Sequence, residues 1–389
     1  MANRITQKRS NVALLVEASS DYTRRLLRGV TTYMQEHQSW IICKGEYRRG
    51  QMIPRELRQG KCNGIIAHIE TEQIAGIIRT CGIPVIDMSS RRLISSVPCV
   101  ETDNNSISKI ASEHLLERGF RHFGFVGDDF FGWSKLRCEY FQQHITEAGY
   151  NCSVFRNSGS KGTAGHWNLD RPRLTLWIQS LSKPAGIMAG WDGYGQQVLE
   201  ACRHCGVAVP DEVAVIGVDN DEMECEFSNP PLSSIDNNPR QIGYECAALL
   251  DCMMSGKKVK QMRYVVQPIG VVMRQSTDVL AIPDSRVSEV IRFIREHACQ
   301  GIGIGEVLRS THLSRRMLEI SLRKYLGHSP HQEILRVKFQ HVKKLLVETN
   351  LTLVDIAERA GFEYQEYMSA AFKRVHGITP GEYRRQFRV

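Results

Sequence analysis

Two stretches near the end of the chain repeat one pattern: residues 304–313 read IGEVLRSTHL and residues 353–362 read LVDIAERAGF. Each is followed by a second amphipathic segment and then by a Gly-x-x-Pro sequence, GHSP at 327–330 and GITP at 377–380. A short amphipathic helix, a tight turn and a second amphipathic helix form a helix-turn-helix. The sequence therefore predicts two such units, at about 304–326 and 353–376.

The turns of the two units contain residues with clear local roles. Ser314 precedes the second helix of the first unit, where its hydroxyl can cap free backbone N–H groups. Gly361 stands in the turn of the second unit, a position that often requires a positive φ. Two units on one chain can enter two successive major grooves of DNA without dimerisation.

The exposed positions of the second helices carry side chains that suit DNA. Arginine can read guanine edges, glutamine adenine edges and glutamate the cytosine amino group. The candidates for base reading are Arg315, Arg316 and Glu319 in the first unit and Tyr364, Gln365 and Glu366 in the second. The candidates for phosphate contacts are Arg323, Lys324, Lys373 and Arg374, with Lys338, Lys343 and Lys344 between the units. Taken singly, such residues are more often solvated helix faces, and the duplication of the unit is what favours DNA binding.

Charge divides the chain in the same way. Residues 285–389 contain 18 Lys and Arg against 11 Asp and Glu, a net charge of +7, while the whole chain carries +8. A basic segment attached to a nearly neutral body is typical of a DNA-binding module.

Residues 287–386 resemble the DNA-binding domain of the AraC family of transcription regulators. The resemblance depends on the two units, on Gly361 in the second turn and on the closing GITP before Tyr383. It implies an all-α domain that binds double-stranded DNA. The family often has Arg deep in each reading helix, where this chain has Ile320 and Ala370. Base reading is therefore expected to depend on the first turns of these helices.

The region from residue 11 to about residue 276 alternates short apolar segments with amphipathic helices. The predicted strands are 12–16, 40–44, 64–68, 84–88, 122–126, 185–189, 213–218 and 232–235. The predicted helices are 22–37, 105–117, 134–148, 194–205 and 241–254. This alternation predicts right-handed βαβ units and parallel sheets that are covered on both faces. The length favours two α/β lobes in a sensor domain of residues 10–278, joined by a linker at 279–286 to the helical domain at 287–386.

Polar and aromatic side chains gather at the ends of the predicted strands. Ligands of parallel α/β domains bind in a crevice at the carboxyl ends of the strands. The candidates for ligand binding are Glu17, Asp21, Tyr22, Asp87, Trp133, Arg137, Trp191, Asp192, Asp219 and Asn220. Carboxylates, amides and an arginine can pair with vicinal hydroxyls, and aromatic rings can cover the apolar face of a sugar. A single Asp or Trp at such a position is more often a helix cap or a core residue. The prediction of a ligand site therefore depends on the clustering of these residues at several strand ends. No glycine-rich phosphate turn follows a strand, which argues against a nucleotide.

The sensor region resembles the periplasmic-binding-protein-like core of the LacI family. The matching segments are 100–104, 115–119, 122–127, 213–220 and 230–235. In that family, the positions that match Arg137, Trp191, Asp192 and Asp219 line the effector cleft. A LacI-like sensor followed by an AraC-like reader is the order of the XylR family of xylose-operon regulators. The resemblance implies a homodimeric, D-xylose-dependent activator that works with RNA polymerase.

The remaining features exclude other classes of protein. Of the 12 cysteines, Cys202 and Cys205 alone have ligand-like spacing, and a zinc site needs two further ligands, so a reduced pair on a helix is expected and no metal. The apolar run at 12–16 is too short for a signal peptide and no stretch is long enough to span a membrane, so we expect a cytoplasmic protein.

Two other functions can be weighed against a sugar sensor. An enzyme fused to a DNA-binding tail would need an activated nucleophile, a metal cluster or a phosphate loop, and the sequence contains none that is convincing. Asp128 and Asp129 follow a strand as in a phosphorylation receiver, but such a domain has about half the length of this sensor. We expect no enzyme activity and no cofactor besides the effector sugar.

Overall fold

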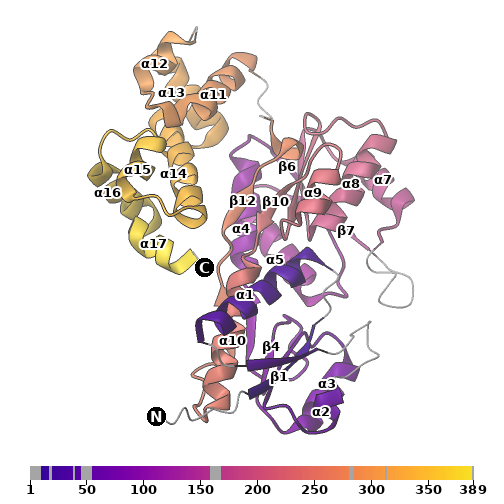
Figure 1. Ribbon diagram of the computed structural model, residues 1–389. Coiled ribbons are helices and arrows are strands. Elements are labelled where there is room, and N and C mark those ends of the chain that lie inside the picture. The colour runs from indigo at the N-terminus through magenta and orange to yellow at the C-terminus, as the bar shows by residue number, and fades with distance from the viewer. Residues whose placement is uncertain are drawn as a thin grey trace.

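The structure is a computed structural model that describes residues 10–16, 20–37, 40–44, 55–157, 168–279, 284–311 and 313–387. It contains two α/β lobes and a helical domain, which lies beside the second lobe (Figure 1). Because 280–283 are not described, half of the predicted linker at 279–286 lies outside the described residues.

The first lobe is built on a six-stranded parallel sheet of order β11-β5-β4-β3-β1-β2. Its strands are β1 (Ser10–Leu15), β2 (Trp40–Lys44), β3 (Gly64–Ala67), β4 (Val85–Asp87), β5 (Cys99–Thr102) and β11 (Arg263–Val266). Its helices are α1 (Asp21–His37), α2 (Arg55–Arg58), α3 (Glu72–Cys81) and α10 (Pro239–Met254). α1 and α10 cover one face of the sheet and α3 packs into the core on the other face. A Cβ on Gly29 would lie 1.9 Å from the carbonyl oxygen of Arg240, so the backbones of α1 and α10 cross almost in contact.

The second lobe is built on a sheet of order β12-β10-β9-β8-β6-β7, in which β12 alone runs antiparallel to its neighbour. Its strands are β6 (His122–Gly127), β7 (Cys152–Arg156), β8 (Ala185–Ala189), β9 (Val213–Val218), β10 (Ser233–Asp236) and β12 (Gly270–Val272). Its helices are α4 (Asn104–Leu116), α5 (Gly132–Glu147), α7 (Arg171–Ser180), α8 (Asp192–His204), α9 (Glu222–Phe227) and the 3₁₀ turn η1 (Gln275–Thr277). α4 and α5 pack on one face, and α7 and α8 on the other.

The predicted two-lobed, parallel-sheet architecture is confirmed. β8 and β9 are buried along their whole length, as expected for parallel strands covered on both faces. The prediction omits β5, β7, β11 and β12. β5, β7 and β11 contain polar or charged residues, and β12 has only three residues, so none of them forms a long apolar run. The chain passes between the lobes after β5, after β10 and after β11.

The helical domain consists of two helix-turn-helix units joined by one long helix, as the repeat predicts. Its helices are α11 (Ser285–His297), the 3₁₀ turn η2 (Ala298–Gln300), α12 (Ile304–Arg309), α13 (Arg315–Leu326), α14 (Pro330–Glu348), α15 (Leu353–Arg359), α16 (Gln365–His376) and α17 (Pro380–Phe387). The Ser314 hydroxyl accepts a hydrogen bond from the Met317 amide at 3.3 Å, which confirms the predicted cap. Gly361 has a φ of 72°, and a Cβ there would lie 2.6 Å from the Cys299 carbonyl oxygen, so only glycine fits.

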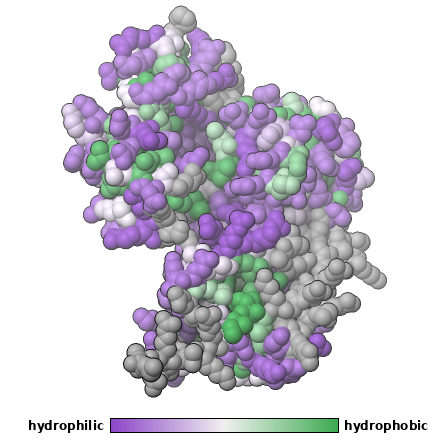
Figure 2. Space-filling view, viewed as in Figure 1, coloured by the Kyte–Doolittle hydropathy of each residue, from purple (hydrophilic) through white to green (hydrophobic). Residues whose placement is uncertain are grey.

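The visible surfaces of the helical domain and the second lobe are largely hydrophilic (Figure 2). Among the described residues, no helix is both long enough and apolar enough to cross a membrane.

Candidate effector cleft and DNA-binding surface

A cavity of about 160 Å³ is lined by residues of both lobes. The first lobe contributes Ser20, Tyr22, Thr23, His68, Glu70, Met88, Ser90, Glu101 and Thr102. The second lobe contributes Asn104, Trp133, Arg137, Trp191, Asp192, Asp219, Asp221 and Asn237. Most of these residues follow the carboxyl ends of strands or begin the next helix, which is where a parallel sheet places its ligands.

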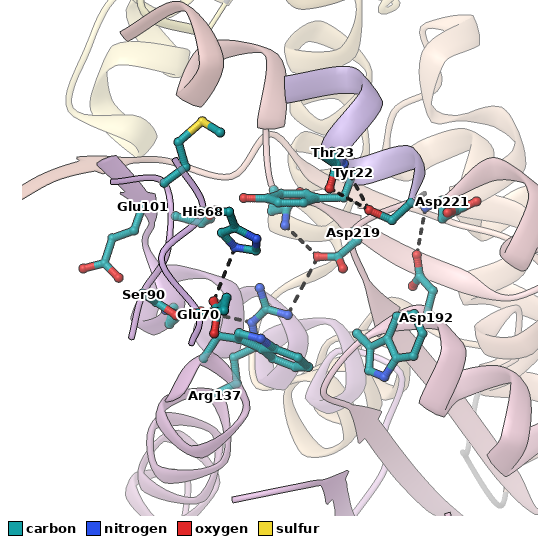
Figure 3. Close-up of a pocket in the computed structure, with 17 residues that line it drawn as sticks. Tyr22, Thr23, His68, Glu70, Ser90, Glu101, Arg137, Asp192, Asp219 and Asp221 are labelled. Carbon is teal, nitrogen blue, oxygen red and sulfur yellow. Dashed lines mark hydrogen bonds and ion pairs between the residues drawn. The ribbon is translucent and has the colours of Figure 1, made fainter. Parts of the chain in front are cut away.

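Arg137 and Asp219 form the charged centre of the cavity (Figure 3). The buried Arg137 guanidinium donates from Nε to Asn104 Oδ1 at 3.0 Å and from Nη1 to the Gly190 carbonyl at 2.6 Å. Its Nη1 also lies 3.8 Å from Asp219 Oδ1. Burial raises the pKa of Asp219 to about 6, although Arg137 opposes this shift. The Asp219 side chain stays 21% exposed, so its carboxylate can still meet a ligand.

The loop that carries Asp219 has an unusual backbone. Asp219 and Asn220 have φ angles of 105° and 50°, a region that L-residues rarely adopt. Arg25 of α1 donates to both of their carbonyl oxygens, at 3.1 and 3.4 Å, and Asn237 Nδ2 donates to Asp219 Oδ1 at 2.7 Å. These contacts hold the strained loop and fix the direction of the Asp219 carboxylate.

The aromatic candidates lie where the strand ends predict them. Trp133 and Trp191 both line the cavity, and the Arg137 guanidinium lies 5.0 Å from the centre of the Trp133 ring. Tyr22 also lines the cavity, and burial together with the Asp219 charge raises its pKa, so its hydroxyl stays protonated. The cavity thus combines apolar ring faces with hydrogen-bond donors and acceptors.

Asp192 lines the cavity, but both of its oxygens already bind the protein. Its Oδ1 accepts from the Ser234 hydroxyl at 2.5 Å and its Oδ2 from the Asp221 amide at 2.8 Å. The side chain is fully buried, which raises its pKa well above the ordinary value. Asp192 therefore holds the loop after β9, and a direct contact with ligand stays a prediction.

Three other candidates do not line the cavity. Asp87 is the last residue of β4, and its carboxylate accepts from the amides of Ile69 and Ser89, so it stabilises the turn instead of facing the cavity. The Asn220 side chain donates to Asp236 and accepts from Arg274. Asp21 begins α1 and pairs with Arg24. Glu17 lies outside the described residues.

Several lining residues escaped the sequence prediction. His68 and Glu70 follow β3 and lie 3.3 Å apart, so the rule of strand ends would have found them. Asn237 follows β10, and its Oδ1 is buried with no hydrogen-bond partner in the described part of the chain. A buried acceptor in a cavity wall needs a donor, which a ligand hydroxyl can supply. No sequence signal distinguishes Glu101, which pairs with Arg263 within the first lobe.

The second helices of the two units present their predicted side chains to solvent. On α13 and α16 the exposed candidates are Arg315, Arg316, Arg323, Lys324, Glu366, Lys373 and Arg374, with Tyr364 just before α16. Glu319 and Gln365 are half-buried, and Glu319 pairs with Arg323 at 3.5 Å. The prediction that Lys338 contacts a phosphate is corrected: the residue is only 8% exposed and its ammonium donates to the Gly361 carbonyl, so it is not available to a phosphate.

Family models match almost the whole length of the chain. The XylR N-terminal domain matches residues 11–105, a periplasmic binding protein-like domain matches 112–277 and a helix-turn-helix domain matches 307–386. The xylose operon regulatory protein of Escherichia coli (strain K12) is 31% identical over 97% of each chain. That of Haemophilus influenzae is 30% identical, over 98% of this chain and 99% of its own.

Solved structures give the same result. The structure of the xylose-binding transcription activator XylR is 30% identical and has a TM-score of 0.62, with 98% of this chain and 100% of that chain covered. A LacI-type regulator from Alkaliphilus metalliredigens complexed with D-xylulofuranose shares the sensor fold at 19% identity and a TM-score of 0.55, over 69% of this chain and 98% of that chain. The chain therefore belongs to the family of xylose operon regulatory proteins, DNA-binding transcription regulators that combine a periplasmic-binding-protein-like sensor with an AraC-type reader.

Proposed function

We propose that this protein is a cytoplasmic, D-xylose-dependent activator of genes for sugar catabolism. It binds the sugar between its lobes and binds promoter DNA with its two helix-turn-helix units. It acts as a homodimer and works with RNA polymerase. The observation that carries the proposal is the polar cavity around Arg137 and Asp219, in a chain of this family.

The chemistry of the cavity suits one sugar ring. Asp219 and Asn237 offer acceptors, Arg137 offers donors, and Trp133 and Trp191 offer ring faces for the C–H side of a sugar. A cavity of about 150 Å³ holds a six-membered ring such as benzene. The volume of about 160 Å³ therefore favours a monosaccharide.

Regulation follows from the position of the site between two lobes. A sugar that touches both lobes binds more tightly when they are close together, and it shifts the equilibrium only by this differential affinity. The altered lobe arrangement then changes how two protomers present their helix-turn-helix units to DNA.

Calorimetry of the full chain against a panel of pentoses and hexoses tests the proposal. We expect D-xylose to bind most tightly. The alternative is a regulator of the same architecture that responds to a different small molecule. Tighter binding of a different sugar would establish this alternative.

The variant Asp219→Asn tests the assigned site. It should weaken D-xylose binding by about 1.5–3 kcal/mol, the value of a hydrogen bond to a charged group. Asp129→Asn is the matched control, because Asp129 pairs with Arg156 outside the cavity. Wild-type affinity in a folded Asp219→Asn protein would contradict the placement of the sugar.

A further inference from the structure

One helix of the sensor reaches from the cavity to the helical domain. α4 begins at Asn104, which lines the cavity and accepts the hydrogen bond of Arg137 Nε. Ser108, one turn later, donates to the Arg137 carbonyl at 2.9 Å. The helix has 13 residues and is therefore about 20 Å long. The first turn of α4 is thus hydrogen-bonded to Arg137, the positively charged residue at the centre of the cavity.

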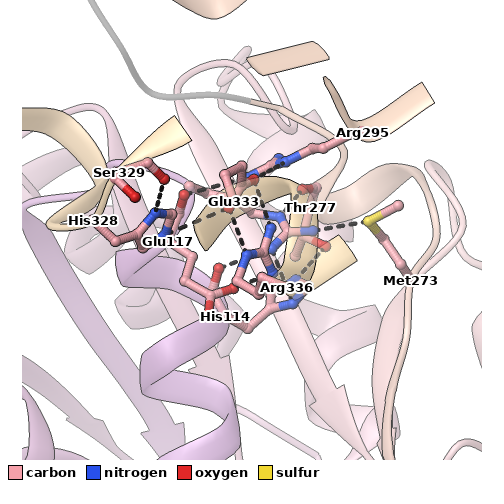
Figure 4. A network of polar contacts seen from close by, with 10 residues as sticks. His114, Glu117, Met273, Thr277, Arg295, His328, Ser329, Glu333 and Arg336 are labelled. Atoms are coloured by element: carbon pink, nitrogen blue, oxygen red, sulfur yellow. Dashed lines mark hydrogen bonds and ion pairs between the residues drawn. The ribbon is translucent and has the colours of Figure 1, made fainter. Parts of the chain in front are cut away.

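The other end of α4 contacts the helical domain. Glu117 is the C-cap of α4, and its Oε2 accepts from Nη1 of Arg336 in α14 at 2.5 Å. Its carbonyl oxygen accepts from Nη2 of Arg295 in α11 at 3.3 Å. Figure 4 shows these side chains converging on the end of α4.

The end of α4 contacts a charged cluster in the helical domain. It consists of the buried Glu333 and the half-buried Arg295, His328 and Arg336. Glu333 is fully buried and accepts from Arg336 at 2.7 and 2.8 Å and from Arg295 at 3.3 Å. His328 Nε2 lies 3.4 Å from its carboxylate. Burial alone would raise the pKa of Glu333, but the hydrogen bonds and charges of the two arginines lower it to about 2. The cluster joins α11, α14 and the loop before α14 into one unit.

A second contact reaches the first reading helix itself. Arg121, just after α4, donates from Nη2 to the carbonyl of Tyr325 at 2.8 Å. Tyr325 lies in the last turn of α13, where carbonyl oxygens lack partners within the helix. The same end of α4 also holds the segment that leads to the linker, because Arg118 donates to the Thr277 carbonyl at 2.7 Å.

We propose that α4 transmits effector binding from the cavity to the first helix-turn-helix unit, with Asn104 as its input and Glu117 and Arg121 as its output. A ligand that binds Arg137 moves the first turn of α4, and the rigid helix carries this movement to α11, α14 and α13. This inference rests on the proposed function for the identity of the ligand, D-xylose. It names the path by which that ligand acts on DNA binding.

Hydrogen exchange of the full chain, with and without D-xylose, tests the path. In the wild type, the sugar should change the exchange rates of α13 amides by about fivefold or more, within the usual range of allosteric coupling. Glu117→Gln and Arg121→Gln should keep sugar affinity within about threefold, because neither residue lines the cavity, but they should lose most of this response. Glu139→Gln is the matched control, because Glu139 pairs with Lys135 on α5 away from the helical domain. A full response in both output variants would overturn the proposal.

A second arm needs no sugar and separates this proposal from the proposed function. Asn104→Ala, which removes the acceptor of Arg137 Nε, should change α13 exchange in the sugar-free protein. The same substitution in a Glu117→Gln background should have little further effect, because both residues lie on one path. Additive effects would overturn the path. If D-xylose does not bind but the two substitutions are non-additive, D-xylose is not the effector and the path through α4 still holds.

Discussion

The two helix-turn-helix units share a fold, but they differ in the side chains that they expose to solvent and in their contacts with the sensor. α13 begins after the capping Ser314 and exposes Arg315 and Arg316 in its first turn. α16 begins after Tyr364, whose side chain makes no capping hydrogen bond, and exposes Glu366. The first unit therefore carries more of the charge that attracts phosphates and of the donors that read guanine.

The attachment of the two units to the sensor differs as well. Glu117 and Arg121 of the sensor bind α11, α13 and α14. Within the described residues, no hydrogen bond or ion pair connects the sensor with α15 or α16. The two units thus share one fold, and in the described part of the chain the first unit alone makes polar contacts with the sensor.

The largest expected effect comes from the charged cluster beside the first unit. Glu333→Gln leaves Arg295 and Arg336 without their shared carboxylate and should lower the free energy of unfolding of the helical domain by about 3–5 kcal/mol. All five tryptophans lie in the sensor region, so far-UV circular dichroism should lose signal at lower urea than tryptophan fluorescence does. Coincident transitions at wild-type urea concentrations would contradict this role.

The same carboxylate gives a pH dependence. The pKa of Glu333 is lowered from 4.5 to about 2, so its stabilising effect is complete above about pH 4.5 and is lost as the pH falls toward 2. A shift of this size is worth about 3 kcal/mol. Acid titration followed by circular dichroism should show this loss in the wild type and a weaker one in Glu333→Gln.

A smaller effect is expected in the turn of the second unit. Gly361→Ala forces a side chain into a positive φ and toward the Cys299 carbonyl, so it should cost about 2 kcal/mol of unfolding free energy. Gly305→Ala in α12 is the control in the first unit, because a Cβ there meets open space. Equal stability of the two variants would show that the second turn tolerates the methyl group.

The two reading helices should also differ in DNA recognition. Arg316→Ala should cost about 1–3 kcal/mol of binding to DNA that the wild type selects from random sequences, and relax preference at one base pair. Gln365→Ala, the counterpart change in the second unit, should cost less, because glutamine adds no phosphate attraction. Titrations with selected and scrambled DNA measure both losses. If Arg316→Ala weakens both DNAs equally, Arg316 contacts a phosphate.

The smallest effect concerns the helix caps. Ser314→Ala removes the acceptor for the Met317 amide and should lower the free energy of unfolding by about 1 kcal/mol. Tyr364→Ser should act in the opposite direction by supplying a cap that α16 lacks. Urea titration followed by far-UV circular dichroism measures both changes.

Local features of the molecule could be predicted from the sequence, because their causes are local. The buried strands β8 and β9 appear as continuous apolar runs, and Ser314 and Gly361 mark turns by their own chemistry. The rule of strand ends found Arg137 and Asp219 in the same way.

Long-range features could not be predicted. Asp87 and Asn220 also follow or end strands, but their side chains bind the turns beside them, and sequence cannot show which way a carboxylate or amide faces. The pair of Glu117 and Arg336 spans 219 positions and exists only when the helical domain docks on α4. Neither residue differs in sequence from an ordinary solvated charge.

α14 belongs to the cores of both units, through Ile334 near its start and Phe339, Val342 and Leu346 further along. It therefore fixes the distance and the orientation between the two reading helices. Reading heads at a fixed spacing can use only binding sites whose two segments face the same side of the duplex, and that side returns every 10 to 10.5 base pairs or about 34–36 Å. An insertion of about half a turn between the segments carries one of them to the far side. An insertion of a whole turn restores the side but moves the segments about 34–36 Å further apart, which a rigid α14 does not allow. We therefore expect the two segments that one protomer reads to keep one separation.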